Sequence, residues 1–341
     1  MALNEIWFVI VAFLFVGYFV LDGFDFGVGM ALPFVSKDDT DRRVVINTIG
    51  PVWDLNETWV IVAGAALFAA FPEWYASLFS GFYLALFLLL VSLIARGVAF
   101  EYRGKGESKR WKNSFDWMII VGSALPALLW GVAFANIVQG VPLDADKNFV
   151  GLDIPLVGGL LVLLNPYALL GGLVTLTLFF THGLIFLTMK TDGDIKERSR
   201  LLATKVGLLA TALAAVFLVW TVLANFTVAG LVLSAVAAVT LIGALIANLV
   251  GKEGIAFTLV VGTVITAISS LFVALFPNVL PSTIDAAYSL NIENASSSEY
   301  TLTVMTWVAA IMLPFVLAYQ SWTYWVFRKR VRREQIPAHA H

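Results

Sequence analysis

The fold class is decided by residues 6–33, which read IWFVIVAFLFVGYFVLDGFDFGVGMALP. This stretch carries only two charged side chains, Asp22 and Asp25. A helix needs about 20 mostly apolar residues to cross a bilayer, so the stretch is long enough to span a membrane. It has no basic segment ahead of the apolar run and continues beyond the length of a signal peptide. We therefore expect a permanent membrane-spanning helix.

The rest of the chain repeats this pattern, and nine membrane-spanning helices are expected in all. Apolar residues make up 60% of the chain and charged residues 13%, a balance that excludes a water-soluble enzyme. The apolar runs do not alternate with polar residues, as they would in a membrane β-barrel. The sequence predicts an all-α polytopic membrane protein with two four-helix bundles and one peripheral helix. The expected spans are residues 6–33, 45–71, 76–99, 116–139, 167–189, 204–225, 228–250, 255–276 and 302–327.

The distribution of Lys and Arg tests this count, because basic residues concentrate in cytoplasmic loops. With nine spans, 20 of the 21 basic residues fall on the side of the C-terminal segment, and only Lys147 falls on the other side. We therefore expect the N-terminus outside and the C-terminus in the cytoplasm. A single long helix across residues 225–230 would reverse the direction of every later span.

The nine spans define one integral membrane domain over residues 1–341. Its longer connections are two polar extracytoplasmic loops, residues 140–165 and 277–301. Residues 328–341 form a basic tail, which we interpret as a cytoplasmic anchor. The net charge is −2 and no basic patch dominates, which excludes a nucleic-acid partner.

Metal ligands are scarce in this sequence. It contains no Cys, which excludes disulfides, thiolate metal sites and covalent haem attachment. Of the three His residues, His339 and His341 lie in the tail and are interpreted as incidental. His182 lies within a span, where a satisfied helix-packing role is favoured over haem ligation because haem b usually needs two axial donors. We therefore expect no metal site in this chain.

Four acidic residues lie within the predicted spans, in two pairs spaced i, i+3. Asp22 pairs with Asp25 and Asp54 with Glu57, and each pair lies on about one helix face. A rise of about 1.5 Å per residue places all four acids, and Arg96, toward the cytoplasmic edge of the membrane. Charges in hydrocarbon are costly and usually mark function. The group predicts a cytoplasmic proton route; the alternative is a set of interfacial residues that pair with headgroups or with one another.

The second acidic pair lies in an unusually polar segment, GPVWDLNETW, at residues 50–59. Its proline frees a backbone carbonyl, and Trp53, Asn56 and Trp59 can line a polar seam with aromatic walls. A lone Trp near the headgroups is normally a membrane anchor. Two Trp residues that flank Asp, Asn and Glu instead favour a built site or a contact with a bulky cofactor.

At these residues the chain resembles subunit II of the cytochrome bd-type quinol oxidases, over essentially its whole length. Leu55 stands where the family often has Gly, and Thr58 where it often has Val. Leu55 would hinder the close approach of another helix at that point, whereas the acids are retained. The matching segments are LDGFDFG at residues 21–27, GPVWDLNETW at 50–59, RGVAFEYR at 96–103, NPY at 165–167 and TVMTW at 303–307, followed by Pro314, Tyr319 and Trp322.

The resemblance implies a function that the residue pattern alone does not. Such oxidases pass electrons from quinol to dioxygen, forming water, in the bacterial inner (cytoplasmic) membrane. Haem b and haem d are ligated by a partner, subunit I, which also holds the quinol site, so this chain would not be catalytic alone. Membrane lipid and quinone are further expected partners. The resemblance also allows a small accessory subunit with a single helix. The positions that match cytoplasmic proton delivery are Asp25 and Asp54, with Trp53 and Arg96 as supporting residues near the interface.

Two other functions fit the residues alone. A proton- or cation-coupled secondary transporter also carries intramembrane acids and helix-breaking Pro and Gly. The acids here, however, lie toward the inner edge of the membrane rather than at mid-bilayer. A purely structural scaffold would use the acids only for pairing, and Asp54→Asn would then leave turnover unchanged.

Overall fold

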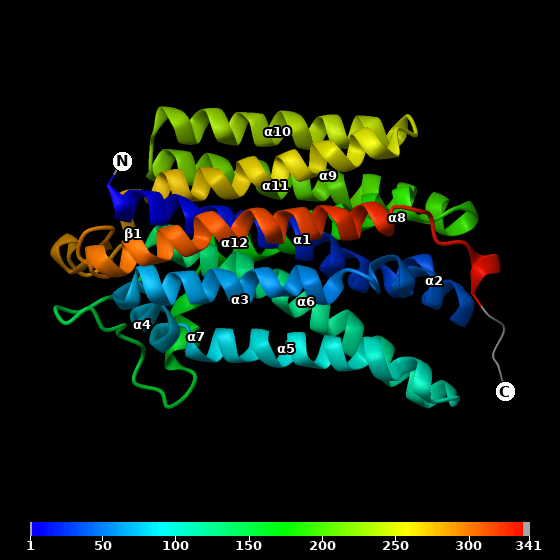
Figure 1. Ribbon diagram of the computed structural model, residues 1–341, viewed down its shortest axis with the longest axis horizontal. Helices are drawn as coiled ribbons and strands as arrows, with labels where there is room; N and C mark the ends of the chain where they lie inside the picture. The colour runs from blue at the N-terminus through cyan, green and yellow to red at the C-terminus, as the bar shows by residue number, and fades with distance from the viewer. Residues whose placement is uncertain (1, 337–341) are drawn as a thin grey trace.

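The chain forms an elongated helical bundle in a computed structural model that describes residues 2–336, so the tail residues His339 and His341 lie outside the described part. Most long helices run along the longest axis, and the start of α1 and the end of α12 lie at opposite ends (Figure 1). The long helices are α1 (Leu3–Val35), α3 (Trp53–Ala70), α5 (Tyr83–Tyr102), α6 (Lys109–Gln139), α8 (Pro166–Lys190), α9 (Gly193–Ala224), α10 (Val228–Leu249), α11 (Glu253–Leu275) and α12 (Glu299–Val326). The short elements are α2 (Asp39–Ile49), α4 (Pro72–Gly81), α7 (Gly158–Leu163), the 3-10 turns η1 (Arg103–Lys105), η2 (Ala286–Tyr288) and η3 (Arg333–Gln335), and the strands β1 (Asn278–Leu280) and β2 (Leu290–Asn291).

Among the described residues, eight helices are long and apolar enough to cross a membrane. The predicted span at residues 45–71 is not one of them, because it is broken into α2 and α3 at residues 50–52. Pro51 lacks the backbone N–H that would continue α2. Helix α3 has 18 residues, and its first turns carry Asp54 and Asn56. The polar segment that marks the candidate site thus also shortens the helix that carries it.

Two other helix boundaries test the predicted spans. The predicted span 76–99 begins too early, because the chain breaks at Phe82, between α4 and α5. The division near residues 225–230 is confirmed, since α9 and α10 are separate helices. Thr227 caps α10 by accepting a hydrogen bond from the backbone N–H of Gly230 at 3.0 Å. The chain therefore reverses direction at this point.

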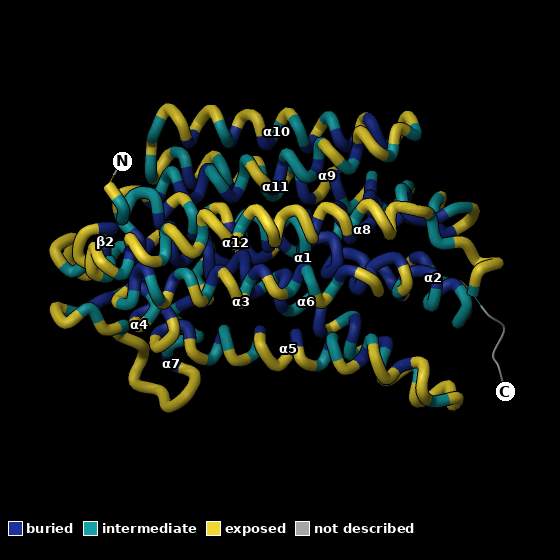
Figure 2. The backbone as a smooth tube through the Cα atoms, in the orientation of Figure 1, coloured by how far each residue is buried: buried dark blue, intermediate teal, exposed yellow. Residues whose placement is uncertain are grey.

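Helix α1 lies at the centre of the bundle and packs against α3, α6, α8 and α11. Every residue from Asp22 to Leu32 is buried, and this half of α1 is dark blue in Figure 2. The approach of α8 is close because α1 and α8 meet at Gly27 and Gly183. A Cβ on Gly27 would lie 2.0 Å from the carbonyl oxygen of Phe179 and 2.6 Å from the backbone nitrogen of Gly183. Small residues at such a crossing let two backbones meet.

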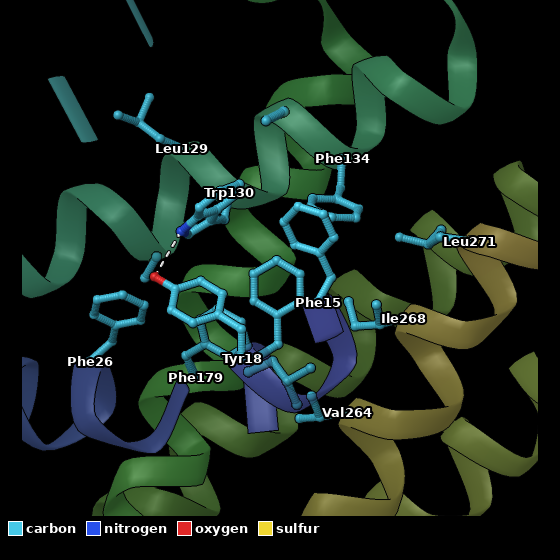
Figure 3. Packing of buried hydrophobic residues seen from close by; sticks show 14 of the residues in the cluster. Phe15, Tyr18, Phe26, Leu129, Trp130, Phe134, Phe179, Val264, Ile268 and Leu271 are labelled. Carbon is cyan, nitrogen blue, oxygen red and sulfur yellow. Dashed lines mark hydrogen bonds between the residues drawn. The ribbon is translucent and has the colours of Figure 1, made fainter. Parts of the chain in front are cut away.

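Aromatic side chains fill the space between α1, α6, α8 and α11 (Figure 3). Phe15 of α1 meets Phe134 of α6 edge-on, with ring centroids 5.2 Å apart. Trp130 Nε1 donates a hydrogen bond to the Tyr18 hydroxyl at 3.1 Å. This bond satisfies both polar groups, as buried Trp and Tyr side chains require.

The two longer loops, residues 140–165 and 277–301, lie at the same end of the bundle and are joined to each other. The Val141 N–H donates to the Pro281 carbonyl at 3.0 Å. Lys147 Nζ donates to the Ala287 carbonyl at 2.8 Å. The basic residue that the sequence places apart from all others is therefore held by a cross-loop contact.

The opposite end carries α2, the turn between α8 and α9, and η3, and we call it the basic end. Its acids accept hydrogen bonds from basic residues of other elements. Asp39 accepts from Arg103 at 2.8 Å and from Lys112 at 2.9 Å, and Asp41 accepts from Arg333 at 2.6 Å. Burial opposes the ionised form of Asp39, but the bonds from Lys112 and Arg103 outweigh it and lower the pKa of this carboxyl to about 2.

Helix α12 lies on the outside of the bundle, beside α1 and α3. Most of its apolar side chains are exposed, including Val308, Phe315 and Trp322, and the helix is largely yellow in Figure 2. Its buried residues are Leu302, Gln320 and Thr323. Two of these three are polar, so its inner face makes polar contacts as well as apolar ones.

Candidate functional site

Arg96 of α5 lies in the interior and pairs with acids from two neighbouring helices. Its Nη2 donates to Asp22 Oδ1 of α1 at 2.7 Å and to Glu57 Oε1 of α3 at 3.0 Å. Its guanidinium lies over the ring of Phe26, 4.4 Å from the centroid, a favourable cation–π geometry. The side chains of Arg96 and Asp22 are fully buried, whereas that of Glu57 is 18% exposed. Helices α1, α3 and α5 thus meet at one charged group.

A second polar group surrounds Asn56 of α3. Its Nδ2 donates to Asp25 Oδ2 at 2.7 Å. Its Oδ1 accepts from Gln320 Nε2 at 3.1 Å and from the Tyr324 hydroxyl at 2.8 Å. Trp59 Nε1 donates in turn to Gln320 Oε1 at 3.3 Å. The predicted polar seam therefore extends from α1 through α3 to α12.

We call Asp22, Asp25, Glu57 and Arg96 the acid cluster. Asp22 Oδ2 and Asp25 Oδ1 are buried and have no hydrogen-bond partner among the described residues. An ionised carboxylate oxygen without a donor can bind a proton. Glu57 is the acid of the cluster that reaches the surface of the chain. The cluster thus combines two buried carboxylate oxygens that lack a hydrogen-bond partner with one acid at the surface.

Asp54 does not join the acid cluster, although the sequence groups it with Glu57. It is exposed on the outer face of α3. Residues three apart on a helix differ by about 60° in direction, and here the edge of the buried face falls between the two acids. Trp53 is half-buried, and its ring lies 5.2 Å from that of Phe100.

His182 packs among aromatic rings in the interior. Its ring lies 5.6 Å from Phe24 and 5.3 Å from Phe257. The prediction that His182 packs between helices agrees with this environment. The prediction that its hydrogen bonds are satisfied does not. Neither imidazole nitrogen has a hydrogen-bond partner among the described residues. Helix α1 approaches α8 so closely at Gly183 that apolar side chains surround the imidazole.

Gln320 and Tyr324 complete the Asn56 group and are absent from the residues that the sequence suggests. A signal for Gln320 exists in the sequence, because a buried amide within an apolar span needs hydrogen-bond partners. Its partners on α3 follow only from the packing of α12 against α3, about 260 residues apart in sequence.

Comparison with known proteins identifies the family. The model of the family described as cytochrome bd terminal oxidase subunit II matches residues 3–327. The chain is 40% identical over 342 residues to the cytochrome bd ubiquinol oxidase subunit 2 of Bacillus subtilis, with 98% of each chain covered. It is 38% identical over 373 residues to the cytochrome bd-I ubiquinol oxidase subunit 2 of Escherichia coli K12, covering 99% of this chain and 98% of the relative.

The fold is similar to that of a solved structure, the bd oxidase from Geobacillus thermodenitrificans. The match has a TM-score of 0.73 and covers 96% of this chain and 100% of the other, at 15% identity. This likeness concerns the fold, whereas the curated relatives and the family model match in sequence along nearly the whole chain. The chain belongs to the cytochrome bd terminal oxidase subunit II family.

Proposed function

We propose that this chain is the second subunit of a complex that oxidises quinol and reduces dioxygen to water. The observation that carries the proposal is family membership over residues 3–327. Relatives in two bacteria are named as ubiquinol oxidase subunits. In the proposal the chain lies in a bacterial inner membrane and packs against a haem-bearing subunit I. Lipid and quinone would contact it there, with room for a small single-helix subunit. Membership removes the reason to retain a secondary transporter as the alternative.

In this proposal haem b and haem d belong to the partner subunit, where they supply the reduction of dioxygen. Within the part of the chain that the structure describes, the residues do not fit haem ligation. His182 offers an imidazole, but Phe24, Phe186 and Phe257 fill the space around it. Phe24 and Phe186 are stacked with centroids 4.2 Å apart. A porphyrin would need a flat space much larger than these rings leave.

We further propose nine membrane crossings, with α3 as the second. An odd number of crossings is supported by the opposite positions of the α1 start and the α12 end (Figure 1). The positive-inside rule then places the basic end in the cytoplasm and the N-terminus outside. In the proposal the helices form one four-helix group of α1, α3, α5 and α6 and a second of α8 to α11, with α12 as the peripheral helix. The two groups pack against each other through the contacts of α1 and α6 with α8. All of them form a single membrane domain.

In this orientation the acid cluster forms part of a proton route from the cytoplasm. Asp54 starts the route at the surface of α3, and Glu57 follows one turn deeper. Glu57 and Asp22 contact the same nitrogen of Arg96. A proton gained by one acid therefore changes the electrostatic environment of the other. Asp25 lies one turn from Asp22 on α1, on the side of the cytoplasmic end of the helix.

The proton route is tested by turnover of the purified complex. We expect Asp25→Asn and Glu57→Gln to lower quinol-driven oxygen consumption at least about tenfold, a typical size for the loss of a proton-transfer group. The haem spectrum and the yield of complex should stay unchanged. Asp153→Asn, which alters an exposed acid in the longer loop 140–165, is the matched control. Full turnover with Asn at both Asp25 and Asp54 would overturn the route and leave a scaffold.

The assignment to the oxidase complex has its own test, which does not depend on the route. The native complex is purified in mild detergent, and reduced-minus-oxidised spectra are recorded before and after the subunits are separated. We expect haem bands to stay with a second large subunit and to be absent from this chain. Haem retained on the isolated chain would contradict the assignment and make His182 a ligand candidate.

A further inference from the structure

The side-chain amide of Asn56 makes every hydrogen bond that an amide can make. Its Nδ2 has two donor hydrogens, which go to Asp25 Oδ2 at 2.7 Å and to the Leu21 carbonyl at 3.3 Å. Its Oδ1 has two lone pairs, which accept from Gln320 at 3.1 Å and Tyr324 at 2.8 Å. Asn56 is fully buried. A rotated amide would place oxygen against oxygen at Asp25 and leave the two α12 donors facing an NH₂ group.

The two donors on α12, together with the Leu21 carbonyl on α1, decide which end of the amide faces Asp25. The Tyr324 hydroxyl also has lone pairs, but Gln320 presents its NH₂ group to Asn56 because its own oxygen accepts from Trp59 Nε1. This chain of bonds fixes Gln320 as a donor and Asn56 Oδ1 as an acceptor. Asn56 can then only donate to Asp25. A donated hydrogen bond stabilises the ionised carboxylate relative to the protonated acid.

We propose that Gln320 and Tyr324 are positioning residues of the proton route, which hold the Asn56 amide so that it donates to Asp25 and favours its ionised form. This inference rests on the proposed role of Asp25 in proton transfer. Neither residue touches Asp25 in a hydrogen bond, so both act through Asn56. The packing of the peripheral helix α12 against α3 thereby determines how readily Asp25 accepts a proton.

Helix α12 is suited to such a role because it lies at the edge of the bundle and little of it is buried. Near its start, Trp7 Nε1 donates to Thr306 Oγ1 at 3.0 Å and to the Leu302 carbonyl at 3.2 Å. Near its end, Gln320 and Tyr324 hold it to Asn56. The outward side of the helix is exposed. A shift of α12 would therefore break the bonds to Asn56 before it disturbed a large apolar core.

Other ionisable groups also act on Asp25, and all of them except Tyr324 are common to the variants below. Asp22 lies one turn earlier on α1, Glu57 comes from α3, and Arg96 comes from α5. Tyr324, on α12, interacts with Asp25 electrostatically. From α8, His182 lies against Phe24, the residue next to Asp25. Variants at Gln320 and Tyr324 leave Asp22, Glu57, Arg96 and His182 in place.

The test is the pH profile of turnover of the purified complex in the double variant Gln320→Met/Tyr324→Phe. Both donors are lost, so the Asn56 oxygen can turn to Asp25 and accept a hydrogen bond from its protonated form. We expect the pH of half-maximal turnover to move upward by about one unit, the change of a tenfold ratio of the two forms. Ser321→Ala, which removes an exposed hydroxyl of α12 bonded to its own helix, should leave the midpoint in place.

Tyr324→Phe alone keeps the test decisive if the double variant does not assemble. It removes one hydroxyl and should move the midpoint in the same direction by a smaller amount. An unmoved midpoint in Tyr324→Phe, and in the double variant where it assembles, would overturn the positioning role.

Asp25→Asn separates this inference from the proton route itself. If Asp25→Asn lowers turnover while the α12 variants behave like Ser321→Ala, the route stands and the positioning role is wrong. If Asp25→Asn retains full turnover, Asp25 is not part of the route and the inference fails; the route as a whole fails only if turnover is also full with Asn at both Asp25 and Asp54. A midpoint shift that disappears when Asp25→Asn is added would support action through Asp25.

Discussion

Arg96 neutralises two buried or half-buried acids through a single nitrogen, and this makes the position sensitive to loss of charge. We predict that Arg96→Leu destabilises the complex strongly, because it leaves Asp22 and Glu57 without a counter-charge. Removing one partner of a buried ion pair costs about 3–5 kcal/mol. The measurement is the midpoint of thermal unfolding of the purified complex, together with the amount recovered from membranes.

The triple variant Arg96→Leu/Asp22→Asn/Glu57→Gln provides the control. It removes the cation and both acids, so the uncompensated charge disappears while the Leu side chain stays. We expect the triple variant to recover most of the lost stability. Equal instability of the single and triple variants would mean that the contacts of Arg96 with Phe26 and Phe100, rather than its charge, hold the helices together.

At this scale the sequence indicates the chemistry of the site better than its geometry. The acids within the spans, and Arg96 beside them, follow from the cost of charge in hydrocarbon. Glu57 faces Arg96 and Asp54 faces outward because of the rotation of α3 about its own axis. The i, i+3 spacing fits equally well a helix rotated so that Asp54 faces inward. The role of Gln320 depends on a neighbour that only the tertiary fold provides.

At the scale of whole helices, the crossing of α1 and α8 depends on two glycines. We predict that Gly27→Ala lowers the yield of assembled complex severalfold, because the added Cβ would lie 2.0 Å from the Phe179 carbonyl oxygen. The obstacle is backbone, which cannot move aside as a side chain can. Overpacking of this kind costs about 1–3 kcal/mol. The measurement is the amount of intact complex after solubilisation.

Gly64→Ala is the matched control for this prediction. Gly64 lies in the middle of α3, and a Cβ there would meet nothing within 4 Å. Alanine is also a better helix former than glycine. The control should therefore assemble at least as well as the unaltered chain. A normal yield from Gly27→Ala would show that α1 and α8 can separate without loss.

The helices themselves are largely predictable, because long apolar runs between basic loops leave few alternatives. Their interruptions are less so. The break at residues 50–52 contains Pro51, a recognisable signal, but the predicted span 45–71 continues across it, because the apolar part of α3 alone is short for a membrane crossing. The break at Phe82 has no proline, and α4 ends there within an apolar region. In such places tertiary packing decides where a helix stops.

For the molecule as a whole, the ion pairs of the basic end predict a dependence of stability on acid pH. The pKa of Asp39 is lowered to about 2, from an ordinary value of about 3.9. The contribution of Asp39 to the free energy of unfolding is therefore complete above about pH 5, and it is lost as the pH falls from about 4 toward 2. We predict that the difference in unfolding temperature between the unaltered complex and Asp39→Asn is constant above pH 5 and shrinks below pH 4.

Asp194→Asn is the control for the basic end. Asp194 and its partner Lys37 are both exposed, at a distance of 3.4 Å, and such pairs contribute little. We expect no difference from the unaltered complex at any pH. A difference for Asp39→Asn that persists unchanged to pH 3 would show that its carboxylate is not stabilised by Arg103 and Lys112.

The segment after α12 has a consequence for the biogenesis of the protein. Arg333 binds Asp38 and Asp41, which flank the start of α2, and the Val331 N–H donates to the Lys190 carbonyl at 2.8 Å. The ribosome makes Asp38 and Asp41 about 290 residues before Arg333. Asp41 can pair with Arg198 once α9 has been made, but its bond to Arg333 forms only after α12 has been made. A chain that stops before the end of α12 would therefore lack the bonds that connect the loop before α2 to the segment after α12.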